Sequence, residues 1–414
     1  MTIQNIGGND NTVAAETARA SMSMRISVLA ALAAVGSFAT NILLPSLPSI
    51  AKTLNVSTAA VSSTISVYLA VFAIGQLIVG PLSDRYGRWK PVLFGLLIFV
   101  AGSLWCEFST TLPMMLIGRS IQALGACAAS VLSRAIARDL LSGEDLTRAL
   151  AFIMVAMSAA PGFSPLIGGL LDATSGWRSE FLIVALFGAI VAFCYLRYVG
   201  ETHRPDGHVS IRPASIMRGY WSLFTDLRFI APAGTIGLFM GALFAMFSVS
   251  PRVLIDGLGF SAIQVGLYFA TTVFAVFASG MAAPRLAIRL GHGRATLIGL
   301  GLAVIGGILL LLAHWAEPSI WTYFIPVMVF LGGFGMVNPL ITATALQPFG
   351  DRAGLASALL GFLQMAGASA GVMLTAAITS ATLAIGVVQA ALTTLGLILY
   401  LAGRRRASVR QGST

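Results

Sequence analysis

The sequence has little charge. Of its 414 residues only 10% are Asp, Glu, Lys or Arg, whereas 57% are hydrophobic and the mean hydropathy is +0.89. Soluble globular domains carry about 25% charged residues, so this composition excludes a soluble protein. Apolar runs recur along the whole chain, and a helix of about 20 apolar residues spans a bilayer. The sequence therefore predicts an all-α integral membrane protein in the lipid bilayer.

Residues that carry metal or enzyme chemistry are also scarce. The three cysteines, Cys106, Cys127 and Cys194, lie in or beside apolar runs and have no second ligand at a metal-binding spacing, so they are expected to be small core residues. The sequence shows no nucleophile–base pair and no phosphate-binding loop. We therefore expect no metal, no cofactor and no enzymatic activity. The net charge of +10 is dispersed through short loops, a pattern that does not indicate a nucleic-acid partner.

Twelve apolar runs predict twelve transmembrane helices. Their approximate ranges are 26–48, 60–82, 91–108, 112–134, 147–171, 177–198, 229–250, 262–286, 294–314, 319–346, 354–379 and 382–403. The polar stretch 199–228 divides them six and six, and we expect it to be a solvated cytoplasmic linker between two six-helix bundles at 26–198 and 229–403. Residues 1–25 and 404–414 are expected to be cytoplasmic tails, the first of them disordered.

Basic residues are distributed unevenly over the loops of this map. Twenty-one of the 25 Lys and Arg residues fall on the side that holds both termini. Lys52, Arg178 and Arg252 fall on the other side, and Arg119 falls within a span. Because Lys and Arg are retained in cytoplasmic loops, this split predicts that both termini are cytoplasmic.

Three stretches are similar to motifs of the major facilitator superfamily. The loop after the second span fits the pattern G-x-L-x-D-R-x-G-R with Gly80, Leu82, Asp84, Arg85, Gly87 and Arg88. The fourth span fits R-x-x-Q-x-x-G with Arg119, Gln122 and Gly125. The fifth span resembles the proline- and glycine-rich motif of antiporters, with Pro161, Gly162, Pro165, Gly168 and Gly169.

Shorter matches narrow the resemblance. Gly176-Trp177-Arg178 and Ser250-Pro251-Arg252 are similar to stretches of the bicyclomycin and chloramphenicol resistance family of bacterial drug:proton antiporters. The resemblance implies the major facilitator fold and a monomeric, multi-pass transporter of the bacterial inner membrane. Such a protein exports drugs or other small amphipathic molecules by alternating access, as a multidrug efflux pump, with protons as the coupling ion. The alternative of a dedicated exporter of one endogenous metabolite stays open.

Two of the motifs suggest moving parts. A carboxylate at Asp84 could cap the positive N-terminus of the 354–379 helix, so we interpret Gly80, Asp84, Arg85, Gly87 and Arg88 as a conformational latch between the halves. Anchoring of the topology alone is the other interpretation. Glycines allow close helix approach and prolines allow bending, so Pro161, Gly162, Pro165, Gly168 and Gly169 predict a hinge or a tight interhelical seam.

Arg119 is the one basic residue predicted within a span, where a charge is costly and usually functional. Asn41 lies at a similar depth in the first span, so the two residues are predicted to face each other across the cavity. The candidate substrate or coupling residues are Asn41, Tyr68, Gln76, Arg119, Gln122, Asn338 and Gln364. Each of them could instead satisfy neighbouring backbone carbonyl groups.

The sequence also lacks a carboxylate in the middle of any predicted span. All fifteen Asp and Glu residues map to tails, loops or span ends. The family resemblance implies an acidic residue in the first helix, within a sequence similar to T-D-x-x-L-P, but this chain has Asn41 after Thr40. Proton coupling is therefore expected to be atypical or absent, with a span-edge carboxylate such as Asp172 as one carrier. An anionic or zwitterionic substrate paired with Arg119 is a further hypothesis.

Overall fold

This computed structural model describes the backbone of residues 7–202 and 213–411, and every regular element in those ranges is helical. The elements in chain order are α1 (Gly7–Asn41), η1 (Leu44–Ser46), α2 (Leu47–Leu54), α3 (Thr58–Tyr86), α4 (Trp89–Glu107), α5 (Leu112–Leu140), α6 (Gly143–Ser175), α7 (Arg178–Tyr198), α8 (Pro213–Phe224), α9 (Leu227–Pro251), η2 (Arg252–Gly257), α10 (Ala262–Leu290), α11 (His292–Leu312), η3 (Ala313–Trp315), α12 (Ile320–Leu346), η4 (Gln347–Arg352), α13 (Ala353–Ala376) and α14 (Ala381–Gln411).

Twelve segments of the described chain are long and apolar enough to cross a membrane. The first, Met22–Leu54, joins the end of α1 to η1 and α2, and the last, Ala381–Arg404, lies in α14. The number and order of the predicted transmembrane helices are confirmed.

Polar residues and glycines set the helix ends. The side chains of Ser57, Thr111, Ser261 and Ser319 each accept a hydrogen bond from a backbone N–H in the first turn of the following helix. The turns after α3 and α10 are made by Gly87 and Gly291, each with a φ of 85°. A side chain in this left-handed conformation would be strained, so glycine allows both tight hairpins.

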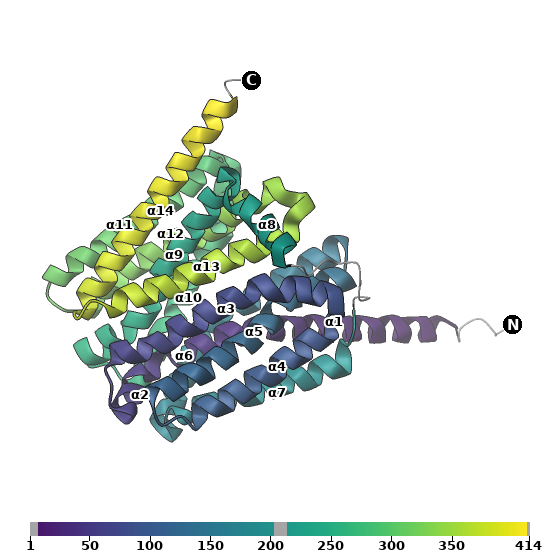
Figure 1. The fold of residues 1–414 in the computed structure, drawn as a ribbon, viewed down its shortest axis with the longest axis horizontal. Coiled ribbons are helices and arrows are strands. Elements are labelled where there is room, and N and C mark those ends of the chain that lie inside the picture. The colour runs from purple at the N-terminus through teal and green to yellow at the C-terminus, as the bar shows by residue number, and fades with distance from the viewer. Residues whose placement is uncertain (1–6, 203–212, 412–414) are drawn as a thin grey trace.

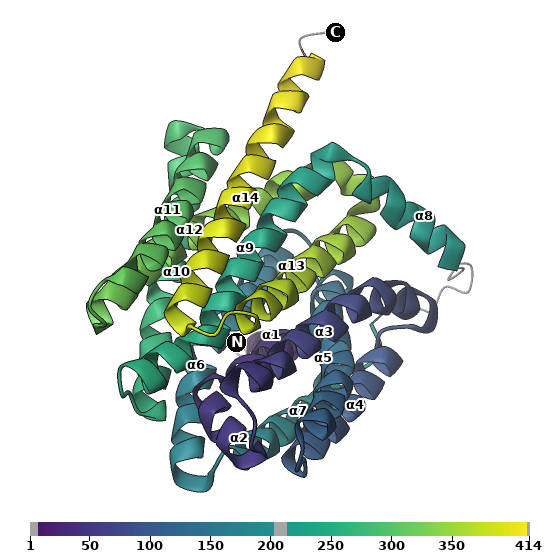
Figure 2. The same ribbon diagram turned by 60° about the vertical axis from the view of Figure 1, so that its left-hand side comes forward.

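The first six of the twelve spans in chain order are called the first group and the last six the second group (Figures 1 and 2). In the first group α1 packs on α5, α6 and α7, while α4 packs on α5 and α7. In the second group α9 packs on α12, α13 and α14, while α11 packs on α12 and α14. The groups meet along α3 with α13 and along α6 with α10. The segment η1 also touches α9 and α10 across this boundary.

The membrane-spanning helices have two ends, which we call the hairpin face and the η1 face. The hairpin face carries the turn between α3 and α4 and the chain at the end of α7. The η1 face carries η1, α2 and the turn between α6 and α7. In Figure 1, α2 lies at the lower left, whereas the described chain extends towards its two termini on the right and at the top.

Two predictions about the polar segments were wrong. The backbone of α1 is already helical at Gly7, so residues 7–25 are not the expected disordered tail; Ala, Glu, Arg and Met in this stretch are good helix formers. The expected linker also contains a helix, α8. Tyr220 and Leu223 of α8 are buried, at 7% and 1% exposure, whereas Trp221 is 63% exposed. This amphipathic pattern explains why α8 packs instead of remaining solvated.

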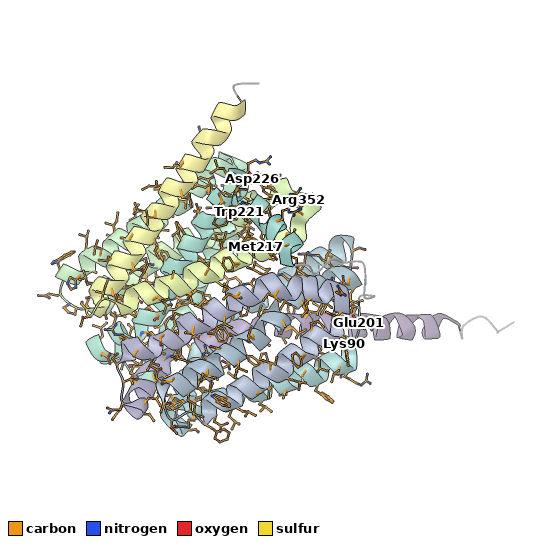
Figure 3. The ribbon with its side chains drawn as sticks, viewed as in Figure 1. Lys90, Glu201, Met217, Trp221, Asp226 and Arg352 are labelled. Atoms are coloured by element: carbon orange, nitrogen blue, oxygen red, sulfur yellow. The ribbon has the colours of Figure 1, made fainter. Side chains whose placement is uncertain are left out.

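α8 bridges the two groups of helices on the hairpin face. The Tyr220 hydroxyl donates to the Leu77 carbonyl of α3 at 3.1 Å, and Arg352 of η4 donates to the Ser222 hydroxyl at 3.3 Å. Figure 3 shows Met217 and Trp221 on α8, with Arg352 nearby in the C-terminal group. α8 therefore connects the groups through side-chain contacts as well as through the chain.

Candidate functional site

Arg119 of α5 is the centre of a buried polar cluster. Its side chain has 0% exposure. Its Nη1 donates to the Ala39 carbonyl of α1 at 3.1 Å and to Oε1 of Gln122 one turn along α5. The guanidinium lies 4.2 Å from the centre of the Tyr68 ring on α3, a cation–π contact. Three helices of the first group thus hold one cation.

Two other hydrogen bonds fix the residues around Arg119. Gln122 donates through Nε2 to the Ser103 hydroxyl of α4 at 2.7 Å, which orients its oxygen towards Arg119. Asn41 donates through Nδ2 to the Ser37 carbonyl of its own helix at 2.7 Å. The four residues Asn41, Tyr68, Arg119 and Gln122 are called the Arg119 cluster below. Tyr68 and Gln122 contact Arg119 directly, whereas Asn41 lies two residues after Ala39 on α1 and no described contact joins it to Arg119. The predicted facing of Asn41 and Arg119 stays a prediction.

Several polar atoms of the Arg119 cluster have no partner within the described chain. These atoms are Nε and Nη2 of Arg119 and Oδ1 of Asn41. No described ion pair involves Arg119, and no hydrogen bond joins it to Asn41. A buried donor left unpaired costs about 1–3 kcal/mol, and more when it is charged. A group that accepts hydrogen bonds or carries negative charge would therefore be stabilised here.

The other three predicted residues lie elsewhere. Gln76 of α3 is buried against Gly361 of α13, at the boundary between the two helix groups. Asn338 of α12 and Gln364 of α13 are half-buried. No described hydrogen bond connects any of the three to the Arg119 cluster.

The second helix group contains a polar aromatic cluster that sequence reasoning missed. Tyr323 of α12 shares a 2.7 Å hydrogen bond with Ser250 of α9, and its ring stacks on that of Tyr268 of α10 at 5.9 Å. The Tyr268 hydroxyl has no described partner although the side chain is buried. Phe269 packs edge-on against Tyr268. Two tyrosines and a serine in three separate apolar runs carried no sequence signal, because their meeting depends on helix packing alone.

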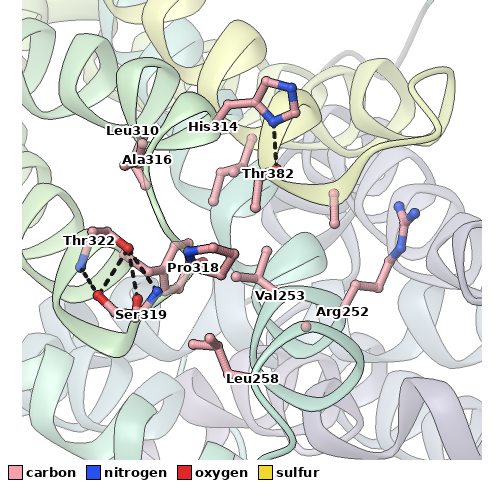
Figure 4. A pocket seen from close by; sticks show the side chains of 15 residues that line it. Arg252, Val253, Leu258, Leu310, His314, Ala316, Pro318, Ser319, Thr322 and Thr382 are labelled. Atoms are coloured by element: carbon pink, nitrogen blue, oxygen red, sulfur yellow. Dashed lines mark hydrogen bonds between the residues drawn. The ribbon is translucent and has the colours of Figure 1, made fainter.

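A small cavity of about 200 Å³ opens near this aromatic cluster on the η1 face (Figure 4). Tyr323 and Thr322 line one side of it. His314 shares a 2.8 Å hydrogen bond with Thr382, and Arg252 donates to the Thr379 carbonyl at 2.7 Å. Both basic side chains are therefore already engaged with the surrounding loops.

The hairpin between α3 and α4 is held by groups of its own half. Glu201, in the chain after α7, accepts hydrogen bonds from the backbone N–H groups of Arg88 at 2.9 Å and Trp89 at 3.2 Å. The Arg88 guanidinium pairs with Asp139 at the end of α5, at 3.0 Å. A carboxylate at these N–H groups stabilises the positive start of α4. Figure 3 shows Glu201 at the end of the helix group from which α1 projects.

The predicted latch remains a prediction. The side chain of Asp84 lies outside the part of the chain that the structure describes, and Arg85 lies 5.8 Å from the Tyr86 ring centre. Glu201 and Asp139, which hold the described part of the hairpin, are not among the predicted latch residues. A carboxylate more than 100 residues away in sequence gives no local signal.

We expect Gly87→Ala to lower the melting temperature of the purified protein. Gly87 has a φ of 85°, where a side chain costs about 1–2 kcal/mol, and a Cβ there would also clash with the Glu201 carboxylate. Gly80→Ala is the matched control, because a Cβ at Gly80 meets nothing within 4 Å. Thermal melts in detergent should separate the two variants, and equal melting temperatures would contradict this account of the turn.

The proline- and glycine-rich stretch lies in the middle and second half of α6. Pro161 and Pro165 are inside one continuous helix. Gly162 and Gly169 face α10 of the other group, at Val273 and Ala262, whereas Gly168 faces the Ile42 carbonyl of its own group. The stretch thus contacts both sides of the boundary between the groups.

Comparison with known proteins identifies the fold. The chain is 31% identical over 385 residues to multidrug resistance protein D of Escherichia coli strain K12, covering 91% of this chain and 92% of that protein. It is 26% identical over 329 residues to the bicyclomycin resistance protein homolog of Haemophilus influenzae, covering 80% and 83%. The structure of a peptide transporter, POT, bound to sulfate superposes with a TM-score of 0.76 at 12% identity, covering 93% and 94%. A sequence profile of the Major Facilitator Superfamily matches residues 29–372, and the chain therefore belongs to that superfamily.

Proposed function

We propose that this protein is a multidrug efflux transporter that moves small amphipathic molecules across the bacterial inner membrane by alternating access. The Arg119 cluster carries the proposal. It combines a buried cation with unpaired donors, an aromatic ring and two amides, in a transporter fold whose relatives include proteins named for multidrug and bicyclomycin resistance. These names favour broad export over the dedicated exporter of one metabolite.

The proposed orientation places the hairpin face in the cytoplasm. Twenty-one basic residues belong to that side and three to the η1 face, which follows the positive-inside rule. The η1 face is then periplasmic. Close contacts of α6 with α10, and of η1 with α9 and α10, support a periplasmic side that is closed in this conformation.

The chemistry of the Arg119 cluster suggests how a substrate is held. Arg119 stays charged at any physiological pH and can donate through Nε and Nη2 to a planar acceptor such as a carboxylate. The Tyr68 ring beneath it supplies an apolar surface. We infer that substrates with a negative or strongly hydrogen-bond-accepting group bind best. An amphipathic body would contact the aromatic side chains of the second group, including Tyr268 and Tyr323.

We expect expression in a pump-deficient bacterial strain to raise the inhibitory concentrations of several unrelated antibiotics. The reason is that a single charged group among apolar and aromatic side chains recognises substrates by their charge and not by their shape. The measurement is a panel that includes neutral, cationic and anionic compounds, with the empty vector as control. If resistance to every compound stays at the vector level while the protein reaches the membrane, the dedicated exporter becomes the better proposal.

A further inference from the structure

Two acidic residues meet the turn that follows α1. Glu180, in the first turn of α7, accepts a hydrogen bond from the Ser46 hydroxyl of η1. Asp172 of α6 accepts one from the Ser49 hydroxyl of α2, at 2.6 Å. Ser46 and Ser49 are three residues apart, so both carboxyl groups hold the same short segment. Sequence position placed both acids at span ends, but Glu180 has 0% exposure.

Within the described part of the chain, no counter-charge pairs with Glu180. Its Oε2 atom has no partner in the described chain, and no described ion pair includes it. Arg178, two residues earlier, donates instead to the carbonyls of Glu107 and Ser109, each at 3.1 Å. Moving an unpaired carboxylate out of water costs several kcal/mol, so this conformation favours the neutral acid.

The charged groups on the neighbouring elements do not stabilise the ionised form of Glu180. Lys52 of α2 is exposed, and Arg25 of α1 bonds to the Tyr198 carbonyl at the opposite end of α7. Asp172 adds negative charge on the α6 side. At the η1 end of the elements packed around Glu180, the charged residues are Lys52, Glu107, Asp172 and Arg178.

The segment that Glu180 holds also touches the other half of the protein. η1 packs on α6 within its own group and on α9 and α10 across the boundary. Opening the η1 face must therefore pull η1 away from α9 and α10. That movement would let water reach Glu180, and a glutamic acid in water is ionised at neutral pH.

We propose that Glu180 binds a proton from the η1 side and that this face closes only when the Glu180 carboxyl is neutral. The inference relies on the alternating access of the proposed function. Closing then takes up one proton and opening releases it. The sign follows from linkage: a lower pH favours the closed face, and the open-to-closed ratio rises by up to about tenfold for each unit of pH increase.

The test measures the distance between the two halves at the η1 face and needs no substrate. Spin labels are attached to Lys52→Cys and Asp256→Cys, two exposed positions on opposite halves. The labels are placed on the full chain in nanodiscs, in a variant in which Cys106, Cys127 and Cys194 are replaced. Export by this cysteine-replaced variant is verified first. Electron–electron distance distributions between pH 5 and pH 8 should lose their short, closed component as the pH rises.

Three variants complete the test. Glu180→Gln, a neutral side chain of the same shape, should remain closed and remove the pH dependence. Ser46→Ala should shift the midpoint but keep the slope, because the titrating group remains. Glu317→Gln, at an exposed acid next to α12 on the same face, should leave the profile unchanged.

A native profile without pH dependence, or full dependence in Glu180→Gln, would overturn the inference. Either result would leave the proposal of drug export standing, because the antibiotic panel tests that proposal separately. Conversely, a protein that shows the predicted profile but raises no resistance would retain the proton site and lose the multidrug proposal.

Discussion

We expect Arg119→Ala to lower export about 10- to 100-fold. Hydrogen bonds to charged groups contribute about 1.5–3 kcal/mol each, and each 1.4 kcal/mol corresponds to a factor of ten in affinity. The variant removes the two unpaired donors and the cation above Tyr68 together. Initial rates of substrate efflux from loaded cells, normalised to the amount of protein in the membrane, measure the change.

The loss should come from substrate binding and not from failed insertion. An arginine at the centre of a membrane helix costs about 2.5–3.5 kcal/mol on insertion scales, so alanine should insert at least as well. Arg119→Lys should restore little, because lysine lacks the planar fork that reaches two acceptors while stacking on an aromatic ring.

Arg285→Ala is the matched control. Arg285 is an exposed arginine of α10 whose described bond is a 3.4 Å contact with the Met281 carbonyl of its own helix. Its removal should leave export at the native level. Full export by Arg119→Ala at normal expression would show that the Arg119 cluster is only structural.

The second large effect is expected from Gly169→Ala, which should reduce turnover about tenfold by disfavouring closure of the η1 face. A Cβ at Gly169 would overlap the carbonyl oxygen of Ala262 in the other half. On the facing helix, a Cβ at Gly266 would come within 2.6 Å of the Leu166 Cα. Overpacking of this kind costs about 1–3 kcal/mol, and here the cost falls on one conformation only.

Helix propensity cannot explain such a loss, because alanine favours a helix over glycine by about 1 kcal/mol. Gly301→Ala in α11 is the control, since a Cβ at Gly301 meets nothing within 4 Å. The same spin-label distances at the η1 face should show a larger open fraction for Gly169→Ala than for the native protein. Gly301→Ala should leave the open fraction unchanged. Native distances and native turnover in Gly169→Ala would rule out a tight boundary at this position.

Local sequence was sufficient for the elements that depend on short windows. Apolar runs of bilayer length predicted the twelve spans, because each transmembrane helix satisfies its own backbone hydrogen bonds. Arg119 stood out because a lone cation in an apolar run is rare. The expected disorder of residues 7–25 and the expected full solvation of the linker were wrong, because low hydrophobicity was interpreted as disorder although the residues of α1 favour a helix and those of α8 form a buried face.

Only the tertiary structure decided which side chains meet. Glu180 looked like an ordinary residue at a span end, and its burial follows from η1 folding over it. Glu201 caps α4 from 112 residues away in the chain, and Tyr268 and Tyr323 join from different helices. The physical reason is that span and turn signals depend on neighbours within a few residues, whereas burial, pairing and unpaired donors depend on packing between distant helices, which local periodicity does not encode.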